Sequence, residues 1–240
     1  MVLFINACVR KKSRTKDLAE HLLSKWNEPY EELYLNAVKF PVVDEDFLNR
    51  RDRLIAERDF SDPMFDLAKQ FAAADAVLIA APFWDLSFPA VLKQYFEQIN
   101  VRGITFYYTP EGIPTGLCRA KSLTYVTTVG GDYFPEEFGA GYVKALAQNF
   151  YGIPDFRLIK ATGLDIIGAD VEAIIHSVKN ELSISRLSVP ASCFSQQGGL
   201  ADLEGVFGPV SCQGCDDSFF CLNPRENARL RAEAWLQNKA

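Results

Sequence analysis

Several features that would assign this 240-residue chain to a class at once are missing from it. No apolar run approaches the roughly 18 residues that a membrane-spanning helix needs, so we expect neither a span nor a membrane partner. Basic residues are not in excess, since 25 lysines and arginines stand against 31 aspartates and glutamates. The net charge of −6 argues against nucleic acid as a partner. A small anionic ligand needs only a local site and stays allowed.

Two glycine motifs that bind nucleotide phosphates are also absent. The chain has no GxxxxGK[ST], which excludes a P-loop, and no GxGxxG, which argues against a dinucleotide held in the Rossmann manner. Histidine is scarce, and His21 and His176 both fall on predicted helices, where we interpret them as structural or surface residues. The first residues, MVLFINACVRKK, place apolar before basic positions, the reverse of a signal peptide. We expect a cytoplasmic protein with reduced thiols.

What is present is a regular alternation of apolar runs and amphipathic segments. Strands are predicted at 2–6, 30–35, 76–81, 122–128 and 156–161. Helices are predicted at 15–26, 62–73, 88–100, 138–150 and 169–182, and the segment 44–60 is a loop or a surface helix. This alternation predicts an α/β fold, a three-layer sandwich with helices on both faces of a parallel sheet. Five strands are typical of the flavodoxin-like variant, whose strand order is 2-1-3-4-5.

The pattern changes after residue 182, which predicts a domain at 1–182 and a C-terminal extension at 183–240. The extension is irregular and rich in serine, glycine and cysteine until a capped helix predicted at 223–239. Four of its cysteines could bind zinc or an iron–sulfur cluster as thiolates, namely Cys193, Cys212, Cys215 and Cys221. Because only one pair forms a CxxC, a metal-free extension or lid is the simpler interpretation.

Ligands of such sheets bind beyond the carboxyl ends of the strands, near the point where the strand order reverses. The loop after the first strand, NACVRKKSRTKDL, carries Arg10 and places Ser13, Arg14 and Thr15 at the start of a helix. Free N–H groups at a helix N-terminus suit a phosphate, and the two hydroxyls add donors. This loop predicts a seat for a phosphate monoester. The alternative is that Ser13 serves only as the helix N-cap.

The loop after the third strand, PFWDL at 82–86, carries large aromatic residues where a polar turn is usual. These rings either lie beside a planar ligand or pack beneath a neighbouring loop, and Ser87 is expected to cap the following helix. After the fourth strand, TTVGG contains paired glycines that allow a ligand to approach the backbone, although such a pair also marks an ordinary turn. Together the three loops offer a phosphate seat, an aromatic wall and a glycine-rich wall.

Over 2–167 the chain resembles the FMN-dependent NADH-azoreductases and NAD(P)H:quinone reductases of the flavodoxin-like superfamily. The resemblance is carried by LKQYF at 92–96, GITFYYT at 103–109 and the Gly116-Leu117 that follows. TTVGG resembles the flavin loop of the family, and YGIPDFRLIKATGLD at 151–165 is similar to its segment around the fifth strand. Two residues depart from the family pattern, since Trp84 replaces a tyrosine and Asp85 replaces an asparagine.

The resemblance implies an enzyme that binds FMN through the three loops. It implies phosphate contacts from the first loop and ring contacts from the other two, a set that comprises Arg10, Ser13, Arg14, Thr15, Pro82, Phe83, Trp84, Asp85, Leu86, Thr128, Val129, Gly130 and Gly131. Phe106 and Tyr108 are candidates for the substrate pocket, or they serve a dimer interface alone.

By the same resemblance, NADH or NADPH gives hydride to flavin N5 and leaves, and a quinone, azo or nitroaromatic compound then takes its place in a ping-pong cycle. The cofactor carries the chemistry, so no catalytic side chain is assigned. A homodimer is implied because a second subunit completes the site in this family. Two alternatives are an electron carrier of the flavodoxin type, which is also acidic, and a flavin-free interaction protein on the same fold.

Overall fold

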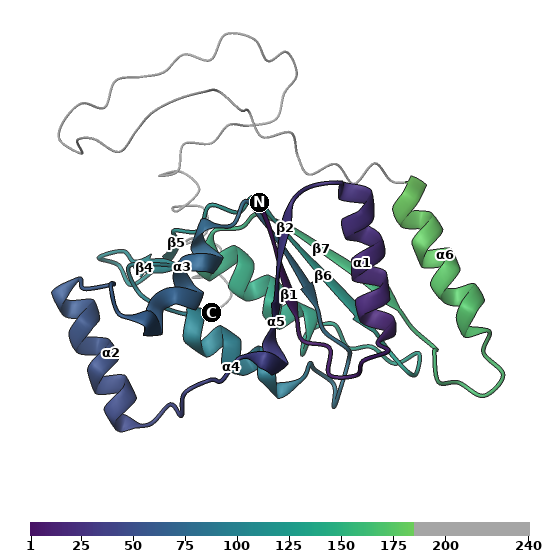
Figure 1. The fold of residues 1–240 in the computed structure, drawn as a ribbon, viewed down its shortest axis with the longest axis horizontal. Helices are drawn as coiled ribbons and strands as arrows, with labels where there is room; N and C mark the ends of the chain where they lie inside the picture. Colours follow the sequence, from purple (N-terminus) through teal and green to yellow (C-terminus); the bar gives the residue numbers. More distant parts are fainter. Residues whose placement is uncertain (185–240) are drawn as a thin grey trace, which may run out of the picture. The chain divides into compact units, whose positions relative to one another are not determined.

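The computed structural model describes residues 1–184, which form a three-layer α/β sandwich (Figure 1). Its centre is a parallel sheet of five strands in the order β2-β1-β3-β6-β7. These strands are β1 Val2–Asn6, β2 Tyr30–Tyr34, β3 Ala76–Ala80, β6 Ser122–Thr128 and β7 Asp155–Ala161. Numbered along the chain, the five follow the predicted order 2-1-3-4-5, so the predicted sheet topology is confirmed.

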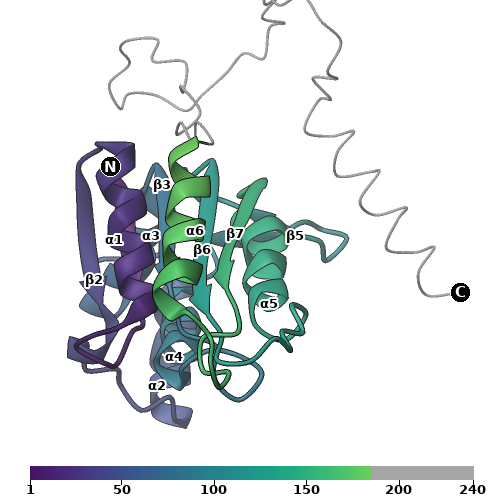
Figure 2. The same cartoon turned by 90° about the vertical axis from the view of Figure 1, so that its right-hand side faces the viewer.

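Helices cover both faces of the sheet. They are α1 Arg14–Trp26, α2 Glu45–Glu57, α3 Asp66–Ala73, α4 Ala90–Ile99, α5 Ala140–Ala145 and α6 Val171–Ile184, with short 3-10 helices η1 Leu35–Ala37 and η2 Pro63–Phe65 and a π-helical continuation of α5, η3 Leu146–Tyr151. In Figure 2, α1 and α6 lie side by side on one face, while α3, α4 and α5 belong to the other.

Alternation along each strand decides which helices its side chains meet. On β1, Leu3 and Ile5 belong to a buried cluster with Phe71 of α3, while Phe4 belongs to a second cluster with Leu22 of α1. Successive strand residues point to opposite faces of the sheet. A strand that is covered on both faces therefore has a nearly continuous apolar sequence. The two clusters of apolar side chains form the core on either face of the sheet.

A small hairpin lies outside the main sheet and was not predicted. Its antiparallel strands are β4 Phe106–Tyr108 and β5 Pro114–Gly116. A Cβ atom on Gly116 would lie 2.1 Å from the carbonyl carbon of Tyr151 and 2.1 Å from the nitrogen of Gly152. The hairpin therefore contacts the end of η3 backbone to backbone, and glycine is the residue that permits this approach.

The predicted segments differ from the structure in their ends. The segment 44–60 contains helix α2, whose N-cap Asp44 accepts a hydrogen bond of 2.9 Å from the N–H of Phe47. Ser87 does not cap α4, because its hydroxyl donates to the Phe138 carbonyl at 3.1 Å and the helix begins only after Pro89. The predicted helix at 138–150 begins at Ala140 and ends as the π-helix η3.

The predicted extension, with Cys193, Cys212, Cys215, Cys221 and the helix at 223–239, lies outside the described residues. The division of the chain at residue 182 therefore stays a prediction. Within 1–184, no helix is both long and apolar enough to cross a membrane.

Candidate functional site

A pocket of about 250 Å³ opens at the carboxyl edge of the sheet, where the loops after β1, β3, β6 and β7 meet. This is the position at which sheets of this topology bind ligands. Most of the predicted cofactor contacts lie around it. The lining residues are Val9, Arg10, Lys12, Ser13, Arg14, Thr15, Pro82, Phe83, Trp84, Thr128, Val129, Gly130, Leu164 and Asp165.

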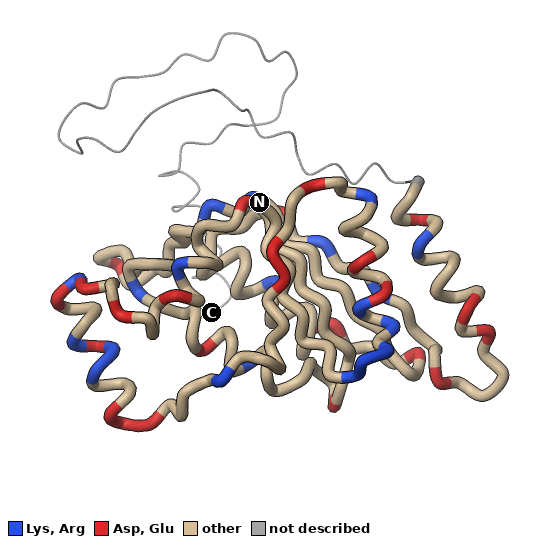
Figure 3. Tube along the Cα trace, viewed as in Figure 1, with Lys and Arg blue, Asp and Glu red and all other residues tan. Residues whose placement is uncertain are grey.

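One end of the pocket is built by the loop at 7–13, which we call the phosphate loop, and by the first turn of α1. Ser13 is the N-cap of α1, and its hydroxyl oxygen accepts from the N–H of Lys16 at 3.3 Å. The first-turn N–H groups of Arg14 and Thr15 have no partner within a helix. The loop that enters α1 carries the basic run Arg10-Lys11-Lys12 and is coloured blue in Figure 3. Donors and positive charge therefore meet at one place, as an anion requires.

The Arg14 side chain is engaged away from the helix N-terminus. Its Nη1 donates to Asp165 Oδ1 at 2.9 Å and to the Leu164 carbonyl at 3.4 Å. Both partners lie in the loop after β7, so the guanidinium joins that loop to the first turn of α1. Arg14 can thus serve an anion through its backbone N–H.

Another part of the pocket lining comes from the loop at 82–87, which we call the ring loop. Its backbone closes on itself, because Trp84 N–H donates to the Ser87 carbonyl at 3.1 Å and Ser87 N–H donates to the Trp84 carbonyl at 2.7 Å. The two residues between them are left-handed, with φ of 50° at Asp85 and 66° at Leu86. Asparagine and aspartate tolerate this conformation better than other non-glycine residues. The backbone therefore explains why an aspartate can replace the asparagine of the family.

The glycine-rich loop after β6 joins the other two loops. Thr128, at the end of β6, shares a hydrogen bond of 2.6 Å between its Oγ1 and Oγ1 of Thr15 in α1. Its carbonyl accepts from the N–H of Phe83 in the ring loop at 3.1 Å. A Cβ on Gly130 would lie 2.6 Å from Asp165 Oδ2, so a glycine here lets the loop after β7 pack closely.

Some predicted contacts lie apart from the pocket. Asp85, Leu86 and Gly131 belong to the same loops but do not line it. The predicted substrate-pocket residues Phe106 and Tyr108 do not line the pocket either. Phe106 is 6% exposed, and its ring centroid lies 4.7 Å from that of Phe150, whereas Tyr108 is exposed. His21 and His176 lie on α1 and α6, where they contact Ser183 and Asn180.

The sequence reasoning missed Val9, Lys12, Leu164 and Asp165 among the lining residues. The last two follow β7, and the loop after the fifth strand was not counted with those that converge. The sequence does contain a signal for this loop. The segment at 151–165, which is similar to that of the family, ends in ATGLD and places a glycine directly before Leu164. Gly163 is left-handed, with φ of 75°, and turns the chain toward the pocket.

The cysteine at the start of the phosphate loop adds no charge to it. Burial raises the pKa of the Cys8 thiol to about 11, so this cysteine stays neutral at physiological pH. Its Sγ lies 3.7 Å from the Ala80 carbonyl, which it faces as a weak donor. Among the residues that line the pocket, Asp165 is the single carboxylate, and it is paired with Arg14.

These residues fit a ligand with a phosphate monoester at one end and a planar ring at the other. Ser13, Thr15 and the first-turn N–H groups of α1 supply the donors that a phosphate needs. Trp84 and Phe83 supply apolar surface for a ring. The ring of Phe83 packs edge-on against that of Phe134, with 4.9 Å between the two ring centroids. The phosphate donors and the apolar surface that line this one pocket are therefore of the kinds that a flavin mononucleotide needs.

Comparison with known proteins agrees with this chemistry. The model of a family described as having a flavodoxin-like fold matches residues 1–183. The FMN-dependent NADH:quinone oxidoreductase of Lachnoclostridium phytofermentans is 37% identical over 193 residues, which cover 76% of this chain and 96% of that protein. That of Clostridium perfringens is 33% identical over 195 residues, covering 77% and 98%.

A solved structure supports the same assignment. The azoreductase of Bacillus anthracis superposes with a TM-score of 0.65 at 28% identity, over 76% of this chain and 96% of that one. The fold, the converging loops and the relatives that match nearly along their whole length lead to one conclusion. This chain belongs to the FMN-dependent NADH:quinone oxidoreductase family of the flavodoxin-like fold.

Proposed function

We propose that this protein is a cytoplasmic, homodimeric enzyme that binds FMN and uses NADH to reduce quinones, azo compounds or nitroaromatics. The observation that carries the proposal is the pocket at the carboxyl edge, where a phosphate seat faces an aromatic wall. When bound, FMN supplies the centre that accepts and donates hydride. The protein supplies the binding groups, the orientation of the ring and the electrostatics.

Each loop has a separate task in this proposal. Ser13, Thr15 and the first-turn N–H groups of α1 hold the phosphate, while Trp84 and the backbone at Gly130 border the ring. The lining residues include no histidine, cysteine or tyrosine, and Asp165 is engaged by Arg14. Water can therefore supply the protons that the acceptor takes up, and no side chain is assigned as a general acid.

Donor and acceptor are proposed to use the same open side of the ring in turn. A ping-pong cycle of this kind gives parallel lines when reciprocal rates are plotted against reciprocal NADH at several quinone concentrations. Converging lines would contradict the shared place and require both substrates to bind together.

The homodimer is supported by exposed apolar side chains of the ring loop. Trp84 is 40% exposed and Leu86 is 45% exposed. Clusters of exposed large apolar residues mark interaction surfaces. Light scattering during size-exclusion chromatography should give twice the chain mass of 26.9 kDa. A monomeric mass would contradict this part of the proposal.

The central experiment is a spectroscopic one. The purified protein should be yellow, lose its colour when NADH is added without oxygen, and regain it when a quinone is added. A yellow protein that NADH does not bleach would favour an electron carrier. A colourless protein that FMN cannot reconstitute would favour a flavin-free interaction protein.

A further inference from the structure

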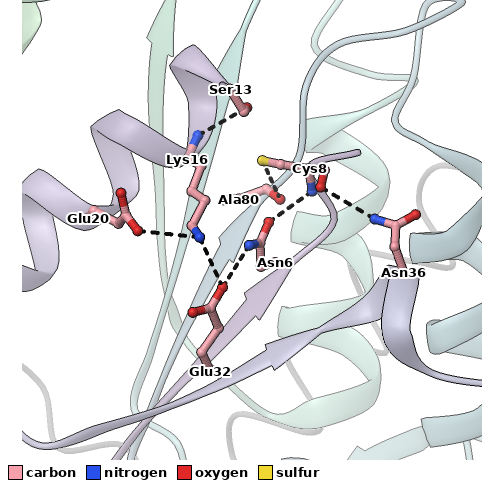
Figure 4. A network of polar contacts seen from close by, with 8 residues as sticks. All are labelled: Asn6, Cys8, Ser13, Lys16, Glu20, Glu32, Asn36 and Ala80. Carbon is pink, nitrogen blue, oxygen red and sulfur yellow. Dashed lines mark hydrogen bonds and ion pairs between the residues drawn. The ribbon is translucent and has the colours of Figure 1, made fainter. Parts of the chain in front are cut away.

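A network of polar contacts holds the phosphate loop at both ends (Figure 4), and apart from Ser13 its side chains do not line the pocket. They come from β1, β2, η1 and α1, and they face one another beneath the loop. None of them belongs to the set of predicted flavin contacts. Their arrangement shows how residues away from the ligand set the shape of the seat.

The start of the loop is held at the peptide groups of Cys8. Asn6 is 1% exposed at the end of β1, and its Oδ1 accepts from the N–H of Cys8 at 2.9 Å. Asn36 of η1 donates from Nδ2 to the Cys8 carbonyl at 3.3 Å. Both backbone groups of Cys8 are thus satisfied by asparagine side chains, which fixes the direction in which the loop leaves β1.

The end of the loop is held through Lys16. The Lys16 N–H donates to the Ser13 hydroxyl, while its Nζ lies 3.7 Å from Glu32 Oε1 and 3.4 Å from Glu20 Oε1. Partial burial lowers the pKa of Lys16, but the two carboxylates outweigh this effect and raise it overall. The ammonium is therefore charged and paired directly below the helix N-terminus.

Glu32 of β2 joins the two ends. Its Oε1 accepts from Nδ2 of the buried Asn6 at 2.7 Å and also faces Lys16. A continuous chain of contacts therefore runs from Cys8 through Asn6, Glu32 and Lys16 to Ser13. Hydrogen bonds to an ionised carboxylate are roughly twice as strong as neutral ones. The chain of contacts thus connects the two ends of the phosphate loop through Glu32 and the side chain of Lys16.

We propose that Glu32 is a positioning residue for the phosphate of FMN. It touches neither the pocket nor the ring, and it acts by holding the phosphate loop in its binding conformation before the ligand arrives. Preorganisation of this kind increases affinity because less ordering is needed on binding. The proposal rests on the proposed function, since the phosphate belongs to FMN. It predicts that Glu32 strengthens binding of FMN but not of riboflavin, which lacks the phosphate.

The test compares the dissociation constants of FMN and riboflavin for the apoprotein, measured by flavin fluorescence. Glu32→Ala should weaken FMN binding about tenfold and change riboflavin binding by less than about twofold. Glu32→Gln keeps an oxygen for Asn6 but removes the charge that faces Lys16. Its dissociation constant for FMN should therefore lie between those of the wild type and Glu32→Ala.

Glu31→Ala is the matched control. Glu31 is the neighbouring carboxylate on the same strand, on the opposite face, and accepts a hydrogen bond of 2.7 Å from Gln70. This variant loses the same charge and one hydrogen bond but should bind both flavins as wild type does. Combining Asn6→Ala with Glu32→Ala should weaken FMN binding by less than the product of the single effects, because both residues act through one chain of contacts.

The outcomes separate this inference from the proposed function. If the wild-type apoprotein fails to bind FMN, the proposed function is wrong and this inference falls with it. Two results would show that only the positioning role is wrong, provided that the wild-type apoprotein binds FMN. Either Glu32→Ala binds FMN as tightly as the wild type does, or it loses affinity for FMN and riboflavin equally. Unfolding curves of each variant show whether a general loss of stability accounts for a change in affinity.

Discussion

The phosphate loop and the ring loop follow the neighbouring strands β1 and β3, yet they are shaped in different ways. The phosphate loop is held by side chains of other elements, such as Asn6 and Glu32. The ring loop is closed by its own backbone at Trp84 and Ser87, with two left-handed residues between them. The first loop can therefore be altered from a distance, whereas the second responds to changes in its own backbone.

The largest effect on the phosphate loop is expected from removal of the Thr15 hydroxyl. Thr15 is 1% exposed, and its hydroxyl shares a hydrogen bond of 2.6 Å with that of Thr128, so Thr15→Val leaves the partly buried Thr128 hydroxyl without this partner and removes a phosphate donor. We expect FMN affinity to fall by about 1.5–3 kcal/mol, with riboflavin affinity nearly unchanged. Titration of the apoprotein measures both, and Thr15→Ser should retain most of the affinity. An equal loss for the two flavins would mean that the two halves of the site are not independent.

The second test addresses the ring loop. Trp84→Ala removes an aromatic side chain that lines the pocket, so FMN and riboflavin should both bind about 1 kcal/mol more weakly. The same fluorescence titration measures the effect. Tyr133→Ala serves as control, because Tyr133 is more exposed and does not line the pocket. A loss confined to FMN would contradict the role of Trp84 at the ring.

The third test examines the backbone of the ring loop through stability. Leu86 has a φ of 66°, a conformation that costs a non-glycine residue about 1–2 kcal/mol. We expect Leu86→Gly to raise the free energy of unfolding by about 1 kcal/mol in urea denaturation. Leu117 has the same exposure of 45% but lacks a positive φ, so Leu117→Gly should lower stability. Destabilisation by both changes would show that the left-handed turn is not strained.

The smallest expected effect concerns the charge of Asp85. A carboxylate near the flavin disfavours its anionic reduced form, so Asp85→Asn should raise the two-electron reduction potential by about 10–20 mV. Asparagine also tolerates the φ of 50°, so the turn should be preserved. A redox titration that shows no shift would leave the backbone as the sole reason for an aspartate here.

The sequence predicted the main sheet because its signal is local and strong. Buried parallel strands such as 2–6 and 76–80 read as apolar runs, and β1 was predicted with the bounds that the structure has. The hairpin β4–β5 was missed because its strands have three residues each, although Thr-Pro-Glu-Gly between them is a turn signal. Short strands are stabilised by tertiary contacts, here the backbone approach at Gly116, which local patterns do not contain.

The site was predictable to the extent that it depends on topology and family motifs. The ends of β1, β3 and β6 were expected to converge, and the structure brings their loops around one pocket. Asp165 was missed because its place depends on the partner Arg14, which is 151 residues away in the sequence. The roles proposed for Asn6 and Glu32 could not be predicted for the same reason, since only the fold brings these two side chains together.

The strand that supplies Glu32 also lies at an edge of the sheet. Within residues 1–184, β2 pairs with β1 on one side and with no strand on the other. Open strand edges invite pairing between molecules, and charged side chains along them discourage it. Glu31 and Glu32 place such charge along β2. The Glu32 carboxylate, which we propose positions the phosphate loop, therefore also disfavours aggregation. A chain that loses both charges should form intermolecular β-structure more readily, which couples cofactor affinity to solubility at this strand.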